Sequence, residues 1–158
     1  MISWEEFNLE EPGLADLGKR MLLQTRAHAG LAFLATIRND GAPRLHPVSL
    51  VFSHDHLYIF IPPDSPKCAD LKRDGRYALQ AFPPPENEEG KEFYISGTVK
   101  WIRDLSARHA IIAETGIYVE EHETLFELFL DRAMYTVLVD RGTPKERPWH
   151  RIWPIAGQ

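Results

Sequence analysis

The sequence has one cysteine, Cys68, and no long apolar run. A lone cysteine excludes a disulfide within the chain and a zinc site built from several thiolates. No apolar stretch approaches the roughly 18 residues that a membrane-spanning helix needs. The N-terminal segment MISWEEFNLEEP is acidic, whereas a secretory signal begins basic and then becomes apolar. We therefore expect a cytoplasmic protein that does not contact a membrane.

The sequence also lacks the signatures of several common sites. Its net charge of −5 is not the basic footprint of a general nucleic-acid binder. It contains no GxGxxG fingerprint and no Walker loop, which excludes the two standard nucleotide cradles. The seven histidines are scattered without an HExxH motif, and the closest cluster, His54-Asp55-His56, lies where a hairpin turn is expected. No metal site is predicted.

What the chain does have is enough apolar sequence for one domain covering residues 1–158. Hydrophobic residues make up 44% of the chain and charged residues 26%, the balance of a globular protein. A helix is predicted for residues 12–28, with Gly30 as its stop signal. Three strands of an antiparallel meander follow at 31–38, 43–53 and 56–61. Turn residues separate them at Asn39-Asp40-Gly41 and at His54-Asp55.

The second half continues this alternation of strands and helices. We predict a helix over 65–74, a strand over 76–82, an exposed loop over 83–90 and a strand over 92–102 with a bulge or tight bend at Gly97. Helices are predicted for 105–115, capped near Asp104, and for 121–132, which is apolar around much of its girth and expected to be buried. The last strands are predicted at 134–140 and 149–155. Six or seven strands without strict βαβ alternation favour a mainly β, α+β fold, an antiparallel barrel with peripheral helices.

The segment Ser65-Pro66-Lys67 is the most specific local motif. Serine is a favoured N-cap, and proline is favoured at the first helical position. The free amides of the next turn and the charge of Lys67 would suit a phosphate. The alternative interpretation of these three residues alone is an ordinary capped surface helix.

Three blocks in order resemble the FMN-binding split barrel of the pyridoxamine 5′-phosphate oxidase-like family. They are LATIRNDGAPRLHPVSLVF (34–52), LYIFIPPDSPKCADLKRDGRYAL (57–79) and EFYISGTVKWI (92–102). The resemblance implies a split barrel that binds FMN at a homodimer interface and acts on a small organic substrate.

The resemblance also implies which residues bind the cofactor. The segment from Arg44 to Val48 would run beside the flavin, with Arg44 and His46 on one face of a strand, and His46 stands where the oxidases often have a phosphate-binding arginine. Ser65 and Lys67 match the family's phosphate-binding Ser-x-Lys, and Pro66 replaces the arginine commonly found between them. The full set of expected cofactor-binding residues is Arg44, Leu45, His46, Pro47, Val48, Ile61, Pro62, Ser65, Pro66, Lys67, Gln80, Trp149 and Trp153. For the two tryptophans the alternative is that they complete the barrel core.

The function implied is an FMN-dependent oxidoreductase in which the isoalloxazine exchanges a hydride with its substrate. The chain lacks the C-terminal Arg-Leu-His-Asp-Arg-type substrate motif of the true oxidase, so we do not expect pyridoxine phosphate oxidation. No catalytic acid or base stands out. Two alternatives stay open: the same fold with deazaflavin F420 or heme, and a non-catalytic flavin-binding dimer.

Overall fold

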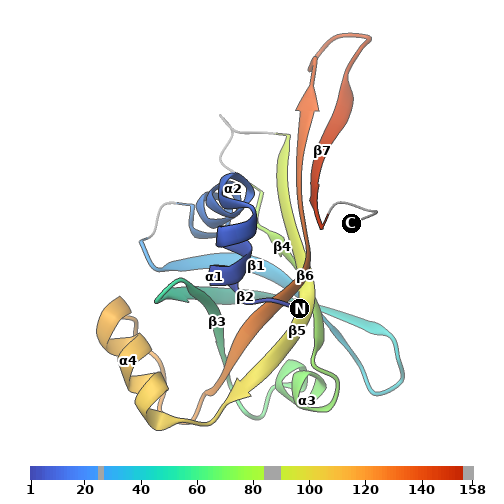
Figure 1. Ribbon diagram of the computed structural model, residues 1–158. Coiled ribbons are helices and arrows are strands. Elements are labelled where there is room, and N and C mark those ends of the chain that lie inside the picture. The colour runs from blue at the N-terminus through green and yellow to red at the C-terminus, as the bar shows by residue number, and fades with distance from the viewer. Residues whose placement is uncertain (25–26, 84–89, 155–158) are drawn as a thin grey trace.

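The computed structural model describes residues 1–24, 27–83 and 90–154 (Figure 1). Four helices and seven strands lie in this part of the chain. The helices are α1 Trp4–Glu10, α2 Pro12–Leu23, α3 Pro66–Arg73 and α4 Leu105–Thr115. The strands are β1 Ala29–Ile37, β2 Pro43–Ser53, β3 His56–Ile61, β4 Arg76–Ala81, β5 Lys91–Ile102, β6 Thr124–Val139 and β7 Arg147–Trp153. None of the helices in the described ranges is long and apolar enough to cross a bilayer.

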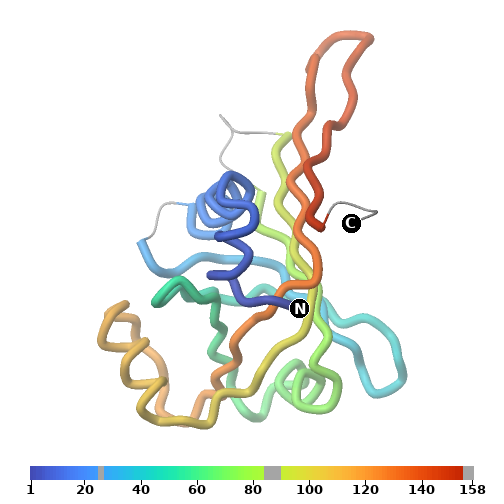
Figure 2. Tube along the Cα trace, in the orientation of Figure 1, coloured from blue at the N-terminus to red at the C-terminus, as the bar shows by residue number. Residues whose placement is uncertain are grey.

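Six of the strands form a closed antiparallel barrel. Their order is β3-β2-β1-β4-β5-β6, and β6 pairs back with β3 to complete the circle. Among the described residues, the seventh strand, β7, pairs only with the second half of β6, from Ala133 to Val139. The tube in Figure 2 shows the consequence: the β6–β7 hairpin extends away from the barrel as an arm. The predicted mainly β barrel with peripheral helices is confirmed.

A bulge lets the long strand β6 serve both the barrel and the arm. The register between β5 and β6 shifts at Ser96 and Gly97, so that Gly97 faces Leu130 and Ser96 faces Arg132. A Cβ on Gly97 would lie 1.9 Å from the carbonyl oxygen of Phe129. Only glycine allows the two backbones to approach this closely, and the predicted bulge at Gly97 is confirmed.

The core fills the barrel and extends under the first two helices. Trp4 of α1 makes edge-to-face contacts with Phe7, Phe52 and Phe93, with ring centroids 4.9–6.3 Å apart. These aromatic contacts join α1 to β2 and β5. In the view of Figure 1, α2 lies above β1 and β2 with α1 directly beneath it, and α3 lies below these strands.

Local sequence signals placed most elements correctly. The meander β1–β2–β3 has the predicted turns, and the hairpin residues His54 and Asp55 both adopt positive φ, at 49° and 58°. Helix α3 begins after Ser65, and α4 begins after Asp104, whose side chain accepts from the amide of Ser106. Both N-caps are confirmed.

The helix predicted for 121–132 is wrong, because β6 occupies that segment from Thr124. Apart from Glu127, the run Leu125–Leu130 is apolar on both faces of the strand. One face lies in the barrel core, and Leu125 on the other face packs with Ile111 of α4. A strand buried on both faces loses the alternation that distinguishes it from a buried helix.

The N-terminal region also differs from the prediction. The sequence analysis missed α1, which begins with a capping box between Ser3 and Glu6. The predicted helix 12–28 ends at Leu23. Gly30 is not its stop signal but a residue of β1, where a Cβ would lie 1.8 Å from the carbonyl oxygen of Leu22. The glycine therefore permits the end of α2 to pack against β1.

Smaller differences occur near the C-terminus, where the last strand begins at Arg147 rather than at residue 149 and ends at Trp153. Parts of three predictions lie outside the described residues: 25–26 of the first helix, 84–89 of the loop and residue 155 of the last strand.

Candidate functional site

A groove of about 430 Å³ lies on the outer face of the barrel, and we call it the β2–β3 groove. Its lining consists of strand residues, the N-terminal turn of α3 and the segment that joins α4 to β6. The lining residues are Ala29, Pro47, Val48, Ser49, Val51, Phe60, Pro62, Lys67, Ile117, Tyr118, Val119 and Glu123. Four of the predicted cofactor-binding residues meet here, namely Pro47, Val48, Pro62 and Lys67. A groove of this size, lined mostly by apolar residues together with Lys67 and Glu123, has the character of a small-molecule site.

One end of the groove is formed by the start of α3. The hydroxyl of Ser65 donates to the carbonyl of Pro62 at 2.9 Å, and its oxygen accepts from the amide of Cys68 at 3.4 Å. These contacts fix the turn that carries Pro62 and Lys67 into the groove. Ile61, the last residue of β3, is fully buried, so it belongs to the core and does not line the groove.

The opposite wall is residues 116–123, between α4 and β6, and a buried arginine holds it. Arg108 is 8% exposed and donates to the carbonyls of Glu120 and Glu123, at 2.6 and 2.7 Å. Its guanidinium carbon also lies 5.1 Å from the ring centroid of Phe60, which lines the groove. Arg108 therefore joins the wall to the groove floor, while Tyr118 on the wall stays 91% exposed.

A second contact fixes the far end of α4 to the β2–β3 turn. The carboxylate of Glu114 accepts from the hydroxyl of Ser53 and from the backbone amide of His54. The Ser53 hydrogen bond is the main cause that lowers the pKa of Glu114. Glu114 and Ser53 both approach the same ring nitrogen of His54, Nδ1. A catalytic triad needs the serine and the acid on opposite nitrogens, so this cluster is a structural tie.

Arg44 and His46 share one face of β2, as the strand period predicted, but this is the inner face and neither residue lines the groove. The outer residues Leu45 and Pro47 are exposed, whereas Arg44 and His46 are half-buried. Arg44 donates from Nε to Asp70 of α3 at 2.7 Å. Pro66, the first residue of α3, lines the same cleft as Arg44 rather than the groove.

Leu45 and Gln80 share the outer face of the barrel with Pro47. Strand pairing places Ala35 opposite Leu45 and Phe33 opposite both Pro47 and Gln80. Leu45 is 64% exposed, and Gln80 lines a separate pocket with Phe33. Besides Gln80 and Ser49, this face carries a set of apolar residues that runs into the groove at Pro47, and we call this set the apolar outer face: Leu31, Phe33, Ala35, Leu45, Pro47, Ala78 and Phe82.

The two predicted tryptophans occupy different surroundings on β7. Trp153 packs against Phe7 with ring centroids 5.0 Å apart and donates from its indole nitrogen to Glu10 at 3.0 Å. It therefore completes the packing under α1, as the alternative interpretation held. Trp149 lies on the arm, paired with Val137, and is 46% exposed. In the described part of the chain, no residue of β7 lines the β2–β3 groove.

Sequence analysis missed the whole wall of the groove. The segment 116–123 was obscured because its second part was assigned to a helix, and Arg108 had no signal beyond its place on α4. Ser49 and Val51 could have been found, since they continue the face of Pro47 at a period of two. Among the described residues, no group of three or more His, Cys, Asp or Glu side chains is placed to hold a metal.

Comparison with known proteins agrees with this architecture. The sequence model of the family described as pyridoxamine 5′-phosphate oxidase matches residues 21–134, and no curated protein sequence is a significant match. Similar solved structures include a heme binding protein from Mycobacterium smegmatis, with a TM-score of 0.57 and 14% identity over 84% of this chain. This chain covers only 56% of that protein.

Two further structures cover most of both chains. A NimC/NimA family protein from Clostridium acetobutylicum has a TM-score of 0.58 and 13% identity, over 90% of this chain and 98% of that one. An F420 reductase has a TM-score of 0.54 and 15% identity, over 72% and 94%. At these identities the structural likeness concerns the fold, while the family match covers most of the chain from α2 to β6. The chain therefore belongs to the pyridoxamine 5′-phosphate oxidase-like family of split barrels.

Proposed function

We propose that the β2–β3 groove binds a flavin-type cofactor, with FMN as the preferred one, and that the protein is an oxidoreductase for a small organic substrate. The observation that carries the proposal is the meeting of Pro47, Val48, Pro62 and Lys67 in one groove beside the Ser65-capped helix. These residues come from two of the sequence blocks that resemble the family.

The residues of the groove fit such a cofactor by their chemistry. Val51, Phe60, Ile117 and Val119 provide apolar walls for a planar ring system. Lys67 provides a positive charge at the α3 end, where the positive helix terminus also favours an anion. The phosphate of the cofactor would therefore lie at α3, and its ring would lie between β2 and the 116–123 wall.

When bound, the cofactor supplies hydride exchange at its isoalloxazine ring. The protein's part is binding and orientation. Lys67 holds the anionic end, and Arg108 fixes the wall against which the ring and substrate pack. Tyr118 offers an exposed aromatic face at the mouth of the groove. Among the described residues that line the groove, no hydrogen bond or ion pair joins two of the titratable side chains of Lys67, Tyr118 and Glu123, which is consistent with the cofactor carrying the chemistry.

We propose further that the protein is a homodimer and that the apolar outer face is the contact between copies. Leu31 and Leu45 are 41% and 64% exposed on this face, next to Pro47 in the groove. A second copy that covers the face would also close the open side of the groove, so that cofactor binding and dimer formation support each other.

A second candidate function keeps the groove and changes the cofactor to deazaflavin F420 or heme. The observation in its favour is that similar folds include an F420 reductase and a heme binding protein. Deazaflavin ends in a phosphate-bearing chain as FMN does, so the α3 end fits both. A non-catalytic flavin-binding dimer would use the same groove without a substrate.

Cofactor identity is tested by an absorption spectrum of the purified protein, followed by titration with FMN, deazaflavin F420 and heme. We expect FMN to bind most tightly. Lys67→Met should weaken FMN binding about tenfold or more, because a charge-assisted contact to the phosphate is lost. Lys72→Met is the matched control on the same helix, since Lys72 stacks over Trp101 outside the groove. A protein that stays colourless with an excess of all three cofactors would contradict the proposal.

Catalysis and assembly need separate measurements. Saturable reduction of the bound flavin by a nicotinamide donor in stopped flow indicates an oxidoreductase, whereas slow, unsaturable reduction indicates a binding module. For the dimer, Leu45→Lys should shift the sedimentation mass toward the monomer. Leu9→Lys should not, although Leu9 is even more exposed at 77%.

A further inference from the structure

A second hollow, which we call the arginine cleft, lies between α3 and the turn that joins β1 to β2. Three arginines line it, Arg38, Arg44 and Arg73, together with Asn39, Asp40, Pro66, Ala69 and Asp70. Its volume is about 420 Å³. Pro66, Ala69, Asp70 and Arg73 follow one another at helical spacing, so one face of α3 forms a whole wall of the cleft.

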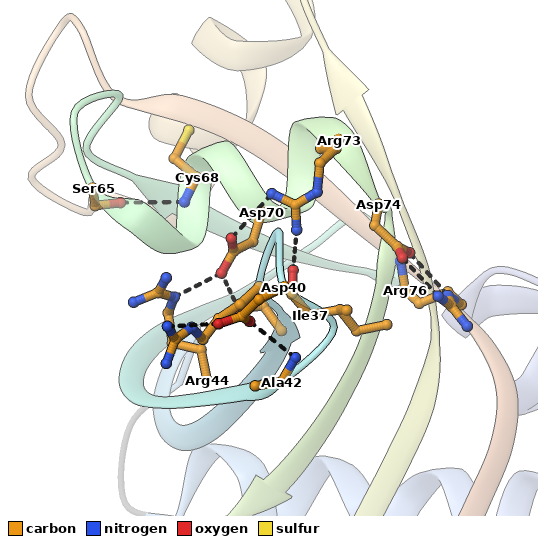
Figure 3. A network of polar contacts seen from close by, with 12 residues as sticks. Ile37, Asp40, Ala42, Arg44, Ser65, Cys68, Asp70, Arg73, Asp74 and Arg76 are labelled. Atoms are coloured by element: carbon orange, nitrogen blue, oxygen red, sulfur yellow. Dashed lines mark hydrogen bonds and ion pairs between the residues drawn. The ribbon is translucent and has the colours of Figure 1, made fainter.

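Buried Asp70 fixes two of the three guanidiniums. It accepts from Arg44 at 2.7 Å, from Arg73 at 3.3 Å and from the hydroxyl of Thr36 at 2.9 Å, as Figure 3 shows for Arg44 and Arg73. Arg73 also donates to the carbonyl of Ile37. Burial alone would raise the pKa of Asp70, but these hydrogen bonds outweigh it and hold the pKa below its ordinary value. The two arginines are therefore held in place by a charged partner.

Some N–H groups of the cleft arginines have no acceptor among these contacts. Arg44 uses its Nε for Asp70, and in the described part of the chain no acceptor contacts its two terminal nitrogens. Arg38 lines the cleft from the β1–β2 turn, where Asp40 pairs with one of its terminal nitrogens at 2.9 Å. A guanidinium carries more N–H groups than one carboxylate oxygen can accept. The cleft thus contains three cations against two anions, Asp40 and Asp70.

A purely structural role would not need the third arginine. The tie between α3 and the β1–β2 hairpin is complete with Asp70, Arg44, Arg73 and Thr36. Arg38 adds a third guanidinium to the same cleft, and its partner Asp40 contacts only one of its two terminal nitrogens. Arginine forks with free, pre-oriented donors are the groups that proteins use for phosphate and carboxylate recognition.

From this arrangement we infer that the arginine cleft is an anion-binding site for a phosphate or carboxylate group. It is distinct from the β2–β3 groove, because Lys67 lines the groove while Pro66, Ala69 and Arg73 line the cleft. The anion could be a free metabolite, or the acidic extension of a cofactor whose phosphate lies at Lys67. The binding chemistry is the same for both sources, and it does not depend on which cofactor occupies the groove.

The probe for the test is inorganic pyrophosphate, titrated calorimetrically into the purified full chain at low salt without any cofactor. We expect saturable binding that weakens as salt is added, because the contacts are charged and partly exposed. Ala69→Glu places a carboxylate in the cleft at an exposed helix position, and should lower the affinity at least about tenfold. Ala69→Gln has the same shape without the charge and should bind within about twofold of the original chain.

Arginine variants give an independent readout. Arg38→Gln should lower pyrophosphate affinity about tenfold, since a charge-assisted contact is lost without disturbing Asp70. Arg76→Gln is the matched control: Arg76 pairs with Asp74 at 2.7 Å outside the cleft (Figure 3). The inference is overturned if the original chain does not bind pyrophosphate, or if Ala69→Glu and Ala69→Gln bind it equally.

Cofactor titrations of the same two Ala69 variants identify the source of the anion. If Ala69→Glu weakens deazaflavin F420, which carries an acidic chain beyond its phosphate, but leaves FMN unchanged, the anion belongs to the cofactor. If pyrophosphate binding is lost and both cofactors bind as before, the anion is a free metabolite. Both results support the site. A failure of the groove to bind any cofactor would leave the pyrophosphate result intact, so the two proposals fail separately.

Discussion

Replacement of Arg108 by methionine should open one wall of the β2–β3 groove while the barrel stays folded. Methionine keeps the length of the side chain and suits a helix, so the change removes mainly the two hydrogen bonds to Glu120 and Glu123. Each bond from a charged donor contributes about 1.5–3 kcal/mol. At the exposed Glu120, water replaces part of the lost hydrogen-bond energy. We therefore expect the two hydrogen bonds of Arg108 together to contribute about 3 kcal/mol to holding segment 116–123 in place. That corresponds to about a hundredfold change in local opening.

Limited proteolysis with chymotrypsin measures this opening. Tyr118 lies in the segment and is 91% exposed, so it is cleaved once the surrounding backbone opens. Cleavage after Tyr118 should be up to about a hundredfold faster in Arg108→Met. Cleavage after Tyr77, which is 5% exposed in the core, reports global unfolding and should change much less. FMN affinity should fall in parallel if the wall contacts the bound ring.

Arg103→Met is the matched control for this experiment. Arg103 also stacks on an aromatic ring, with its guanidinium carbon 4.0 Å from the ring centroid of Trp101, but it lies at the surface before α4. The reasoning is refuted if Tyr118 is cleaved at the same rate in Arg108→Met and Arg103→Met while both proteins remain folded. Faster cleavage at Tyr77 and Tyr118 together would show instead that Arg108 supports the whole fold.

Three further predictions concern stability. Asp70→Asn should lower the free energy of unfolding by about 2 kcal/mol at pH 7, after allowance for the partly exposed arginines. Because the pKa of Asp70 is depressed in the folded state, this contribution is present above the unfolded pKa and is lost as the pH falls through the folded pKa. Urea titrations should therefore show the stabilities of the two proteins converging below about pH 4. Gly97→Ala should cost at least about 2 kcal/mol in the same assay, since the new Cβ would meet the carbonyl oxygen of Phe129; an unchanged urea midpoint would contradict the close approach. Ser3→Ala removes the capping box of α1 and should cost about 1 kcal/mol, whereas Ser3→Thr should retain most of the stability.

Short-range chemistry explains which parts of the fold the sequence could predict. Asn39-Asp40-Gly41 forms the predicted turn because Gly41 adopts a φ of 83° and Asp40 accepts from the amide of Ala42. The Ser65-Pro66 pair starts α3 for equally local reasons. The phosphate-type helix and the β2 face could therefore be predicted before the structure was known.

Long-range packing explains what could not be predicted. Leu125 is buried on the outer face of β6 because α4 covers it, and nothing near it in the sequence indicates that cover. The wrong helix prediction for 121–132 also hid one wall of the groove, because segment 116–123 could be placed only once β6 was known to be a strand. The pairing of Arg44 with Asp70 was hidden for the same reason, since these residues meet only when α3 packs against the β1–β2 hairpin.

The closing pair of the barrel has a consequence for how the chain is synthesised. Strand β3 finds its second partner only in the first residues of β6, with Tyr58–Ile61 facing Thr124–Glu127. The meander β1–β3 leaves the ribosome well before β6, so the outer edge of β3 stays unpaired during the translation of α3, β4, β5 and α4. An unpaired edge in a nascent chain is a site where another chain can add. Slow translation through α4 should therefore lower the yield of folded protein. Rapid synthesis of β6 should raise this yield, because β6 then pairs with the edge of β3 sooner.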